Sequence, residues 1–83
     1  MDKILICLEV PSIFQTYEMY VPDFLTVREL VALLVRTVVE LSGGLYYPTG
    51  YEFLCAKEAD FLLDADASLS QYEIGNGDHL LLL

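Results

Sequence analysis

Basic residues are scarce in this chain, which has four lysines and arginines against thirteen aspartates and glutamates in 83 residues. The formal net charge of −9 argues against nucleic acid or an anionic membrane surface as a partner, because both require lysine and arginine to neutralise phosphates. A basic protein surface would instead be attracted, and its approach accelerated. The alternative role of the charge is to keep exposed apolar side chains in solution.

Cysteine is also scarce, and long apolar runs are missing. Cys7 and Cys55 lie in separate strand-like segments without a CxxC pair, so we interpret both as reduced residues, which is typical of the cytosol. No segment approaches the roughly 20 apolar residues that span a bilayer. The start, Met1-Asp2-Lys3, leads into alternating residues rather than a signal core. We therefore expect a soluble, unprocessed protein that is cytoplasmic or peripheral to a membrane complex, without direct membrane insertion.

A converging set of catalytic or metal-binding groups is missing as well. His79 is the only histidine, and we expect Cys7 to lie beside it across the first and last strands by chance rather than as a catalytic pair. Asp60, Asp64 and Asp66 alternate like the start of a calcium loop, but no glycine follows at its sixth position and no glutamate at its twelfth. The sequence therefore predicts no enzyme, no bound metal and no other cofactor.

Five short segments have the pattern of strands. The first two, 3–10 and 16–21, place only apolar residues or tyrosine on one face and their charged residues on the other, and they form a predicted hairpin. Its turn lacks an Asn-Gly or Asp-Gly pair, so we expect a longer loop there. The other three predicted strands lie at 51–56, 61–63 and 79–83.

A helix is clearly marked between the second and third strands. The run Thr26-Val27-Arg28-Glu29 is a capping box, in which the Thr26 hydroxyl accepts from the Glu29 amide and the Glu29 carboxylate reaches back to the Thr26 amide. Apolar residues then recur at helical spacing until Ser42-Gly43-Gly44 ends the helix. The helix is more apolar than one buried face requires, because three residues fall off its main stripe: Leu33, Val35 and Val39.

This order of elements is typical of an α+β fold of the β-grasp type. Such a fold has a mixed sheet of four to five strands, built from a β-hairpin, an α-helix and two to three further strands, and packed on the one helix. The first and last strands then lie side by side as a parallel pair. We expect the whole chain, 1–83, to form a single domain of this kind, because its length leaves no room for a second.

Two stretches resemble the ubiquitin superfamily. The run Leu69-Ser70-Gln71-Tyr72-Glu73-Ile74, followed by a turn and by Leu80 and Leu82, is similar to the signature in which a leucine, a tyrosine turn and an isoleucine precede the final strand. The start of the predicted helix also resembles that of ubiquitin. The resemblance implies a ubiquitin-like β-grasp domain.

Within that superfamily the chain resembles the YukD and EsaB proteins of bacterial type VII (WXG100) secretion systems. The resemblance covers nearly the whole chain and includes Tyr17-Glu18-Met19, Val21-Pro22, Leu25, the turn from Ile74 to Asp78 and a leucine-rich ending. The chain departs from the family at Gly43-Gly44, in the extended loop to Tyr51 and at Cys55. The resemblance implies a cytosolic accessory component or regulator that contacts a membrane component or the ATPase of the secretion system.

The last residues differ from those of a protein modifier. A conjugated modifier needs a flexible tail that ends in two glycines, whereas this sequence still has a strand pattern at Leu83. Gly43-Gly44 lies in mid-chain, at the predicted helix end. We therefore expect a docking module that is not conjugated.

The expected docking surface is the face of the sheet turned away from the helix. In the third strand we expect Tyr51, Phe53 and Cys55 to face inward, because Glu52 and Glu58 would be costly to bury. The outward residues then form an apolar patch: Leu5, Cys7, Tyr20, Leu54, Ala56, Leu81 and Leu83. Four acids are expected at its rim: Glu9, Glu18, Glu52 and Glu58.

Several alternatives stay open at this point. The strand faces could be reversed, or loops could cover part of the patch. Two such patches could also pair in a homodimer, and the domain could be an adaptor unrelated to secretion. A processed modifier or sulfur carrier is a further alternative, which the missing tail disfavours.

Overall fold

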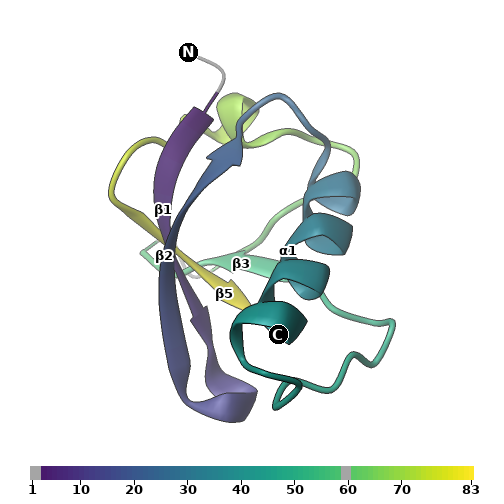
Figure 1. Ribbon diagram of the computed structural model, residues 1–83. Coiled ribbons are helices and arrows are strands. Elements are labelled where there is room, and N and C mark those ends of the chain that lie inside the picture. Colours follow the sequence, from purple (N-terminus) through teal and green to yellow (C-terminus); the bar gives the residue numbers. More distant parts are fainter. Residues whose placement is uncertain (1–2, 59–60) are drawn as a thin grey trace.

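The computed structural model describes residues 3–58 and 61–83, and these form one sheet and one long helix (Figure 1). The elements in chain order are β1 (Lys3–Val10), β2 (Gln15–Pro22), α1 (Val27–Leu41), β3 (Leu54–Ala56), β4 (Phe61–Leu62) and β5 (Asp78–Leu82). Two short 3-10 turns lie over Pro11–Ile13 and Leu69–Tyr72. The prediction of an α+β, ubiquitin-like β-grasp fold is confirmed.

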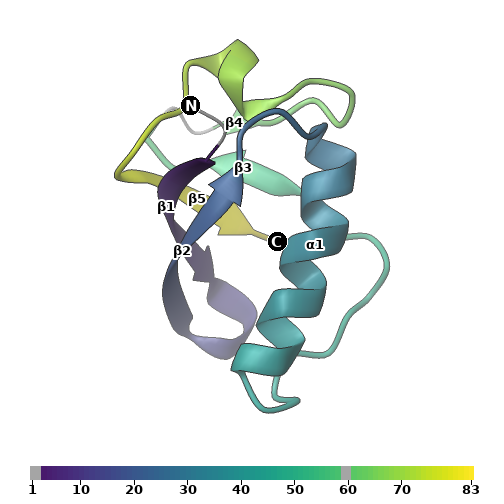
Figure 2. The ribbon, with the colours of Figure 1, turned by 45° about the horizontal axis from the view of Figure 1, so that its top comes forward.

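The five strands are arranged in the order β2-β1-β5-β3-β4. β1 and β5 are parallel, with Leu8 opposite Leu80, and the other neighbouring pairs are antiparallel. The parallel pairing of the first and last strands was predicted and places both in the middle of the sheet. Helix α1 crosses one face of the sheet, so the other face is not covered by the helix (Figure 2).

The helix begins as the capping box predicts. The Thr26 hydroxyl accepts from the Glu29 amide at 3.2 Å, and the Thr26 amide donates to the Glu29 carboxylate at 3.0 Å. Such a cap stabilises a helix start because the first amides have no partner within the helix. After Leu41 the chain turns away through Gly43 and Gly44, whose φ angles are 65° and 86°. Glycine adopts this left-handed conformation without steric cost, as the predicted helix stop requires.

The core lies between α1 and the inner face of the sheet. We use the name inner face for the strand residues that point toward α1. The most deeply buried residues, each less than 2% exposed or close to it, come from both layers: Ile6, Leu8, Val10, Val21, Leu30, Leu34, Val38, Leu54, Leu69, Leu80 and Leu82. Burial of each such side chain contributes about 1.5–3 kcal/mol. Among the described residues no polar or charged side chain is buried.

The later strands are shorter than the sequence predicts. β3 begins at Leu54 rather than at Tyr51, which is 86% exposed. β4 ends at Leu62, although the Leu63 amide still donates to the Leu54 carbonyl at 3.0 Å. β5 ends at Leu82, and Leu83 exchanges two hydrogen bonds of 3.0 Å with Phe53. Backbone pairing in the sheet therefore extends to Leu83.

The structure also addresses the membrane question. Helix α1 has 15 residues, among them Arg28, Glu29, Arg36 and Glu40. In the part of the chain that the structure describes, no helix has the length and apolar character needed to cross a membrane.

Candidate functional site

The uncovered side of the sheet carries the candidate site. Because side chains alternate along a strand, every residue between two inner-face residues points to this side. We call this side the outer face and define it by these residues: Leu5, Cys7, Glu9, Glu18, Tyr20, Phe53, Cys55, Lys57, Leu62, His79, Leu81 and Leu83.

Five of the seven residues predicted from the sequence lie on this outer face. They are Leu5, Cys7, Tyr20, Leu81 and Leu83. Tyr20 is 70% exposed and lies opposite Leu5, whereas Leu83 is 45% exposed and lies at the other end of the face. The structure therefore places these side chains where the sequence predicts, but it divides them between two ends of the face.

The placement of Leu54 and Ala56 on the outer face is wrong. Leu54 is 0% exposed and lies opposite Leu82, and Ala56 is 9% exposed and lies opposite Leu80. Both belong to the core beneath α1. The third strand is therefore turned over relative to the prediction, and Phe53 is exposed on the outer face instead of buried.

The physical reason for this error is the environment of Glu52. Its carboxylate accepts from the Tyr46 hydroxyl at 2.9 Å and from the amides of Thr49 and Gly50 at 2.7 and 3.2 Å. Burial raises the pKa of Glu52, but these hydrogen bonds outweigh it and leave the pKa below its ordinary value. The helix side of the strand therefore accommodates this carboxylate, and Glu52 is not part of an acidic rim.

Phe53, Cys55 and Leu62 take the place of Leu54 and Ala56 on the outer face, although the sequence predicts Phe53 and Cys55 inward and assigns Leu62 to neither face. Cys55 lies between Leu81 and Leu62, and Phe53 pairs with Leu83. We call the five residues Phe53, Cys55, Leu62, Leu81 and Leu83 the apolar cluster. Phe53, Leu62 and Leu83 are 43%, 60% and 45% exposed, so the cluster presents a real apolar surface.

A polar group separates the apolar cluster from Leu5 and Tyr20. Lys57 forms an ion pair with Glu9, and the Lys57 amide donates to the His79 carbonyl at 3.2 Å. The hydrogen bond from Lys57 holds the pKa of Glu9 below its ordinary value, and the same contact raises the pKa of Lys57. Glu9 was predicted at the rim of the patch, but it lies between the two apolar parts and is balanced by a cation.

The predicted position of Cys7 beside His79 is confirmed by the strand register, which places the two residues opposite each other. Nδ1 of His79 is buried and lies 3.7 Å from the nearer Glu9 oxygen, which is too far for a hydrogen bond. Asp60, the first residue of the calcium-like pattern, is outside the described residues. In residues 3–58 and 61–83 no group of three or more histidine, cysteine or acidic side chains could hold a metal ion.

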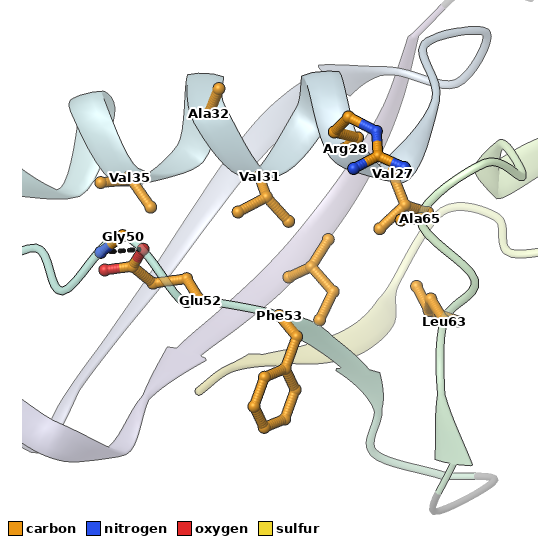
Figure 3. Close-up of a pocket in the computed structure, with 11 residues that line it drawn as sticks. Val27, Arg28, Val31, Ala32, Val35, Gly50, Glu52, Phe53, Leu63 and Ala65 are labelled. Carbon is orange, nitrogen blue, oxygen red and sulfur yellow. Dashed lines mark hydrogen bonds between the residues drawn. The ribbon is translucent and has the colours of Figure 1, made fainter.

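A groove between α1 and the segment before β3 is a second feature that the sequence analysis missed. It has a volume of about 390 Å³, and Val31 and Val35 point into it from the helix (Figure 3). Glu52 and Gly50 border one end, while Arg28, which pairs with Asp66 at 2.9 Å, borders the other. The position of Val35 off the main apolar stripe was the sequence signal for this groove.

Comparison with known proteins establishes the kind of fold. The sequence matches no family model, and no curated protein matches it. The ubiquitin-like domain of EccD5 from Mycobacterium xenopi has a TM-score of 0.82 at 15% identity, covering 100% of this chain and 94% of that one. The ubiquitin-like domain of EccD1, a type VII secretion system protein of Mycobacterium tuberculosis, has a TM-score of 0.78 at 14% identity, covering 100% and 99%.

A third similar structure is a chain of the MycP5-free ESX-5 inner membrane complex. Its TM-score is 0.81 at 17% identity, and the match covers all of this chain but only 21% of that one. The fold is therefore that of ubiquitin-like domains, including those of type VII secretion proteins. Membership of the YukD and EsaB family in particular stays a prediction.

Proposed function

We propose that this domain is a non-catalytic docking module of a type VII secretion system and binds a protein component of that system through its outer face. In this role it is a cytoplasmic accessory component or regulator, peripheral to a membrane complex. Its partner is a membrane component or the ATPase of the secretion system.

The observation that carries the proposal is similarity over the full length of the chain to ubiquitin-like domains of EccD proteins. Two of these domains are covered to 94% and 99%, so the likeness extends to the whole unit and not to a shared hairpin. A third similar structure is a chain of the ESX-5 inner membrane complex, of which the match covers 21%. The YukD-like features of the sequence point to the same secretion context.

The outer face supports docking as the activity. Three residues of its apolar cluster are exposed, namely Phe53, Leu62 and Leu83, whereas the inner face is closed by α1. Exposed apolar patches with polar residues around them are typical of protein contact sites. The net charge of −9 favours a partner with a basic surface, and added salt should slow that association.

An experiment with purified components tests the proposal. Tyr20→Asp combined with Leu62→Asp places charges on both apolar parts of the outer face without changing a buried residue. Binding to the cytoplasmic parts of the type VII ATPase and membrane components, measured by biolayer interferometry, should weaken at least about tenfold, because each buried apolar side chain contributes over 1 kcal/mol.

Leu33→Asp is the matched control, since Leu33 is an exposed apolar residue on α1, on the other side of the molecule. It should leave the affinity unchanged, and circular dichroism should show that all variants keep the fold. Equal affinities for the wild type and the outer-face variant would contradict the proposal. Mass-shifted conjugates of the protein on an immunoblot would point to a modifier instead.

A further inference from the structure

Two segments without any charged residue lie together at one end of the molecule. Residues 10–17 and 41–51 contain no aspartate, glutamate, lysine, arginine or histidine, although the chain has a net charge of −9. Ser12 and Tyr47, one from each segment, line the same hollow of about 280 Å³. Figures 1 and 2 show the tip of the β1–β2 hairpin and the loop after α1 at this end. We call the two segments the uncharged end.

The uncharged end exposes large apolar and aromatic side chains. Five of them are more than half exposed: Phe14 (93%), Tyr47 (87%), Tyr51 (86%), Leu45 (60%) and Leu41 (56%). Single exposed apolar residues are normal on protein surfaces, but a concentration in two adjacent loops is typical of a contact site. Tyrosine and phenylalanine are also the side chains that most often anchor protein interfaces.

Phe14 is held in an unusual backbone conformation. Its φ angle is 55°, in the left-handed region, and its amide donates to the Pro11 carbonyl at 3.1 Å. This region is disfavoured for a bulky residue, and such strain commonly persists where a side chain has a function. The hairpin therefore presents the phenylalanine ring to solvent at a conformational cost that glycine would not incur.

The charges on the rest of the surface indicate which kind of partner can bind to the uncharged end. The start of α1 and the segment that leads into β5 lie at the opposite end in Figure 2, and the sequence of these parts is rich in acids: Asp23, Glu29, Asp64, Asp66, Glu73 and Asp78. Two copies that approach through such surfaces repel each other. Contact through the uncharged ends avoids this repulsion and keeps the acidic ends of the two copies apart. A basic partner, in contrast, finds no carboxylate within these two segments, and the Glu52 carboxylate beside them already accepts from the Tyr46 hydroxyl and from the amides of Thr49 and Gly50.

We propose that the uncharged end is a self-association surface, through which two copies of this chain form a weak dimer with two-fold symmetry. In a two-fold dimer each patch meets its own copy, so one self-complementary apolar surface suffices. Because Val10 and Tyr46 are buried in the core, the two segments offer fewer than the roughly 20 residues a side of an ordinary interface, which suits a weak dimer. This contact reaches the outer face only at Leu83, which lines the same hollow, and leaves the rest of that face free, so a dimer presents two docking surfaces to the secretion partner of the proposed function.

Sedimentation equilibrium of the whole chain, over a dilution series from millimolar to micromolar, tests the proposal. The wild type should dimerise, and more strongly when salt is raised from about 0.01 M to about 1 M, because the Debye length falls from roughly 30 Å to 3 Å and screens the mutual repulsion. Phe14→Gly with Tyr47→Ser should weaken the dimer at least about tenfold. Glycine suits the left-handed conformation, so this variant should unfold at the same temperature as the wild type or higher.

Tyr20→Ser with Leu62→Ser, on the outer face, is the control and should leave the dimer constant unchanged. A wild type that is monomeric at all concentrations, or a dimer lost in this control instead, would overturn the proposal. So would binding of the wild type to phosphatidylcholine vesicles that the Phe14→Gly variant loses, since the uncharged end would then be a lipid contact. Docking to the secretion partner should weaken when salt is added and in the outer-face variants, whereas dimerisation should strengthen with salt and should not change in those variants. The failure of one proposal is therefore distinguishable from the failure of the other.

Discussion

The two faces of the sheet come from the same strands but differ in continuity. The inner face is apolar from β2 to β3 and is closed by α1. The outer face has two apolar parts, and the group of Glu9, Lys57 and His79 lies between them. Neighbouring residues of one strand therefore have different roles: inner-face residues pack in the core and stabilise the fold, and outer-face residues are available for contact.

The largest expected effect is a difference in the free energy of unfolding between variants of two adjacent residues, one on the inner face and one on the outer face. Leu54→Ala should cost about 2–5 kcal/mol, because it leaves a cavity beneath α1, and this is comparable with the whole stability of so small a domain. Phe53→Ala, one residue away, removes an exposed ring and should cost much less. Urea unfolding measures the free energy of unfolding of both variants. Equal losses of stability would show that the two faces do not differ in their contribution to the core.

A pH effect should follow from Tyr46, which is buried at the edge of the core. Burial and its hydrogen bond to Glu52 raise the pKa of Tyr46 from 10.0 to about 12. The folded state thus resists ionisation of this phenol, and its stabilising effect is complete below pH 10 and is lost as the pH rises toward 12. The loss should reach roughly 2 kcal/mol near the upper limit. Urea midpoints across this range should fall more steeply for the wild type than for Tyr46→Phe.

A smaller effect is expected at the start of the helix that closes the inner face. Thr26→Ala removes the hydroxyl that accepts from the Glu29 amide, and should cost about 1 kcal/mol. Thermal unfolding measures this change, with Thr26→Ser as a control that keeps a capping hydroxyl. If serine and alanine gave the same loss, the cap would not stabilise the helix.

The smallest effect is expected at the polar group of the outer face. Lys57→Gln removes the cation beside Glu9, so the pKa of Glu9 should rise toward its ordinary value. The unfolding temperature should change little, because exposed ion pairs contribute little to stability. Carbon-13 NMR titration of the Glu9 carboxyl group measures the pKa, and an unchanged value would show that Lys57 does not control this carboxylate.

Much of the fold could be predicted from the sequence, because its first half contains local signals. In 3–10 one face has only apolar residues and the other contains Lys3 and Glu9, which assigns Ile6 and Leu8 to the inner face, as observed. The capping box and the two glycines fix the helix ends to within a residue. The hairpin has the long turn that the missing Asn-Gly pair indicates, and a 3-10 turn over Pro11–Ile13 fills it.

The third strand could not be oriented from the sequence. Leu54, Cys55 and Ala56 are all buried, so a period of two residues contains no information about which face is inner. The predicted orientation of the strand then depends on Glu52, which is expected to point away from the core. The hydrogen bonds that accommodate its carboxylate come from a loop whose conformation the sequence does not reveal. Leu54 and Ala56 were consequently placed on the wrong face, Phe53 and Cys55 were placed inward instead of outward, and Leu62 was not assigned to a face.

The most direct test of docking through the outer face is an amide NMR titration of the labelled domain with a purified cytoplasmic part of the type VII ATPase or membrane component that binds it. We expect the largest chemical-shift changes on the outer face, around Leu5 and Tyr20 and around Leu62 and Leu81. Changes confined to α1 and to the groove beside Val35, with the outer face unaffected, would contradict it.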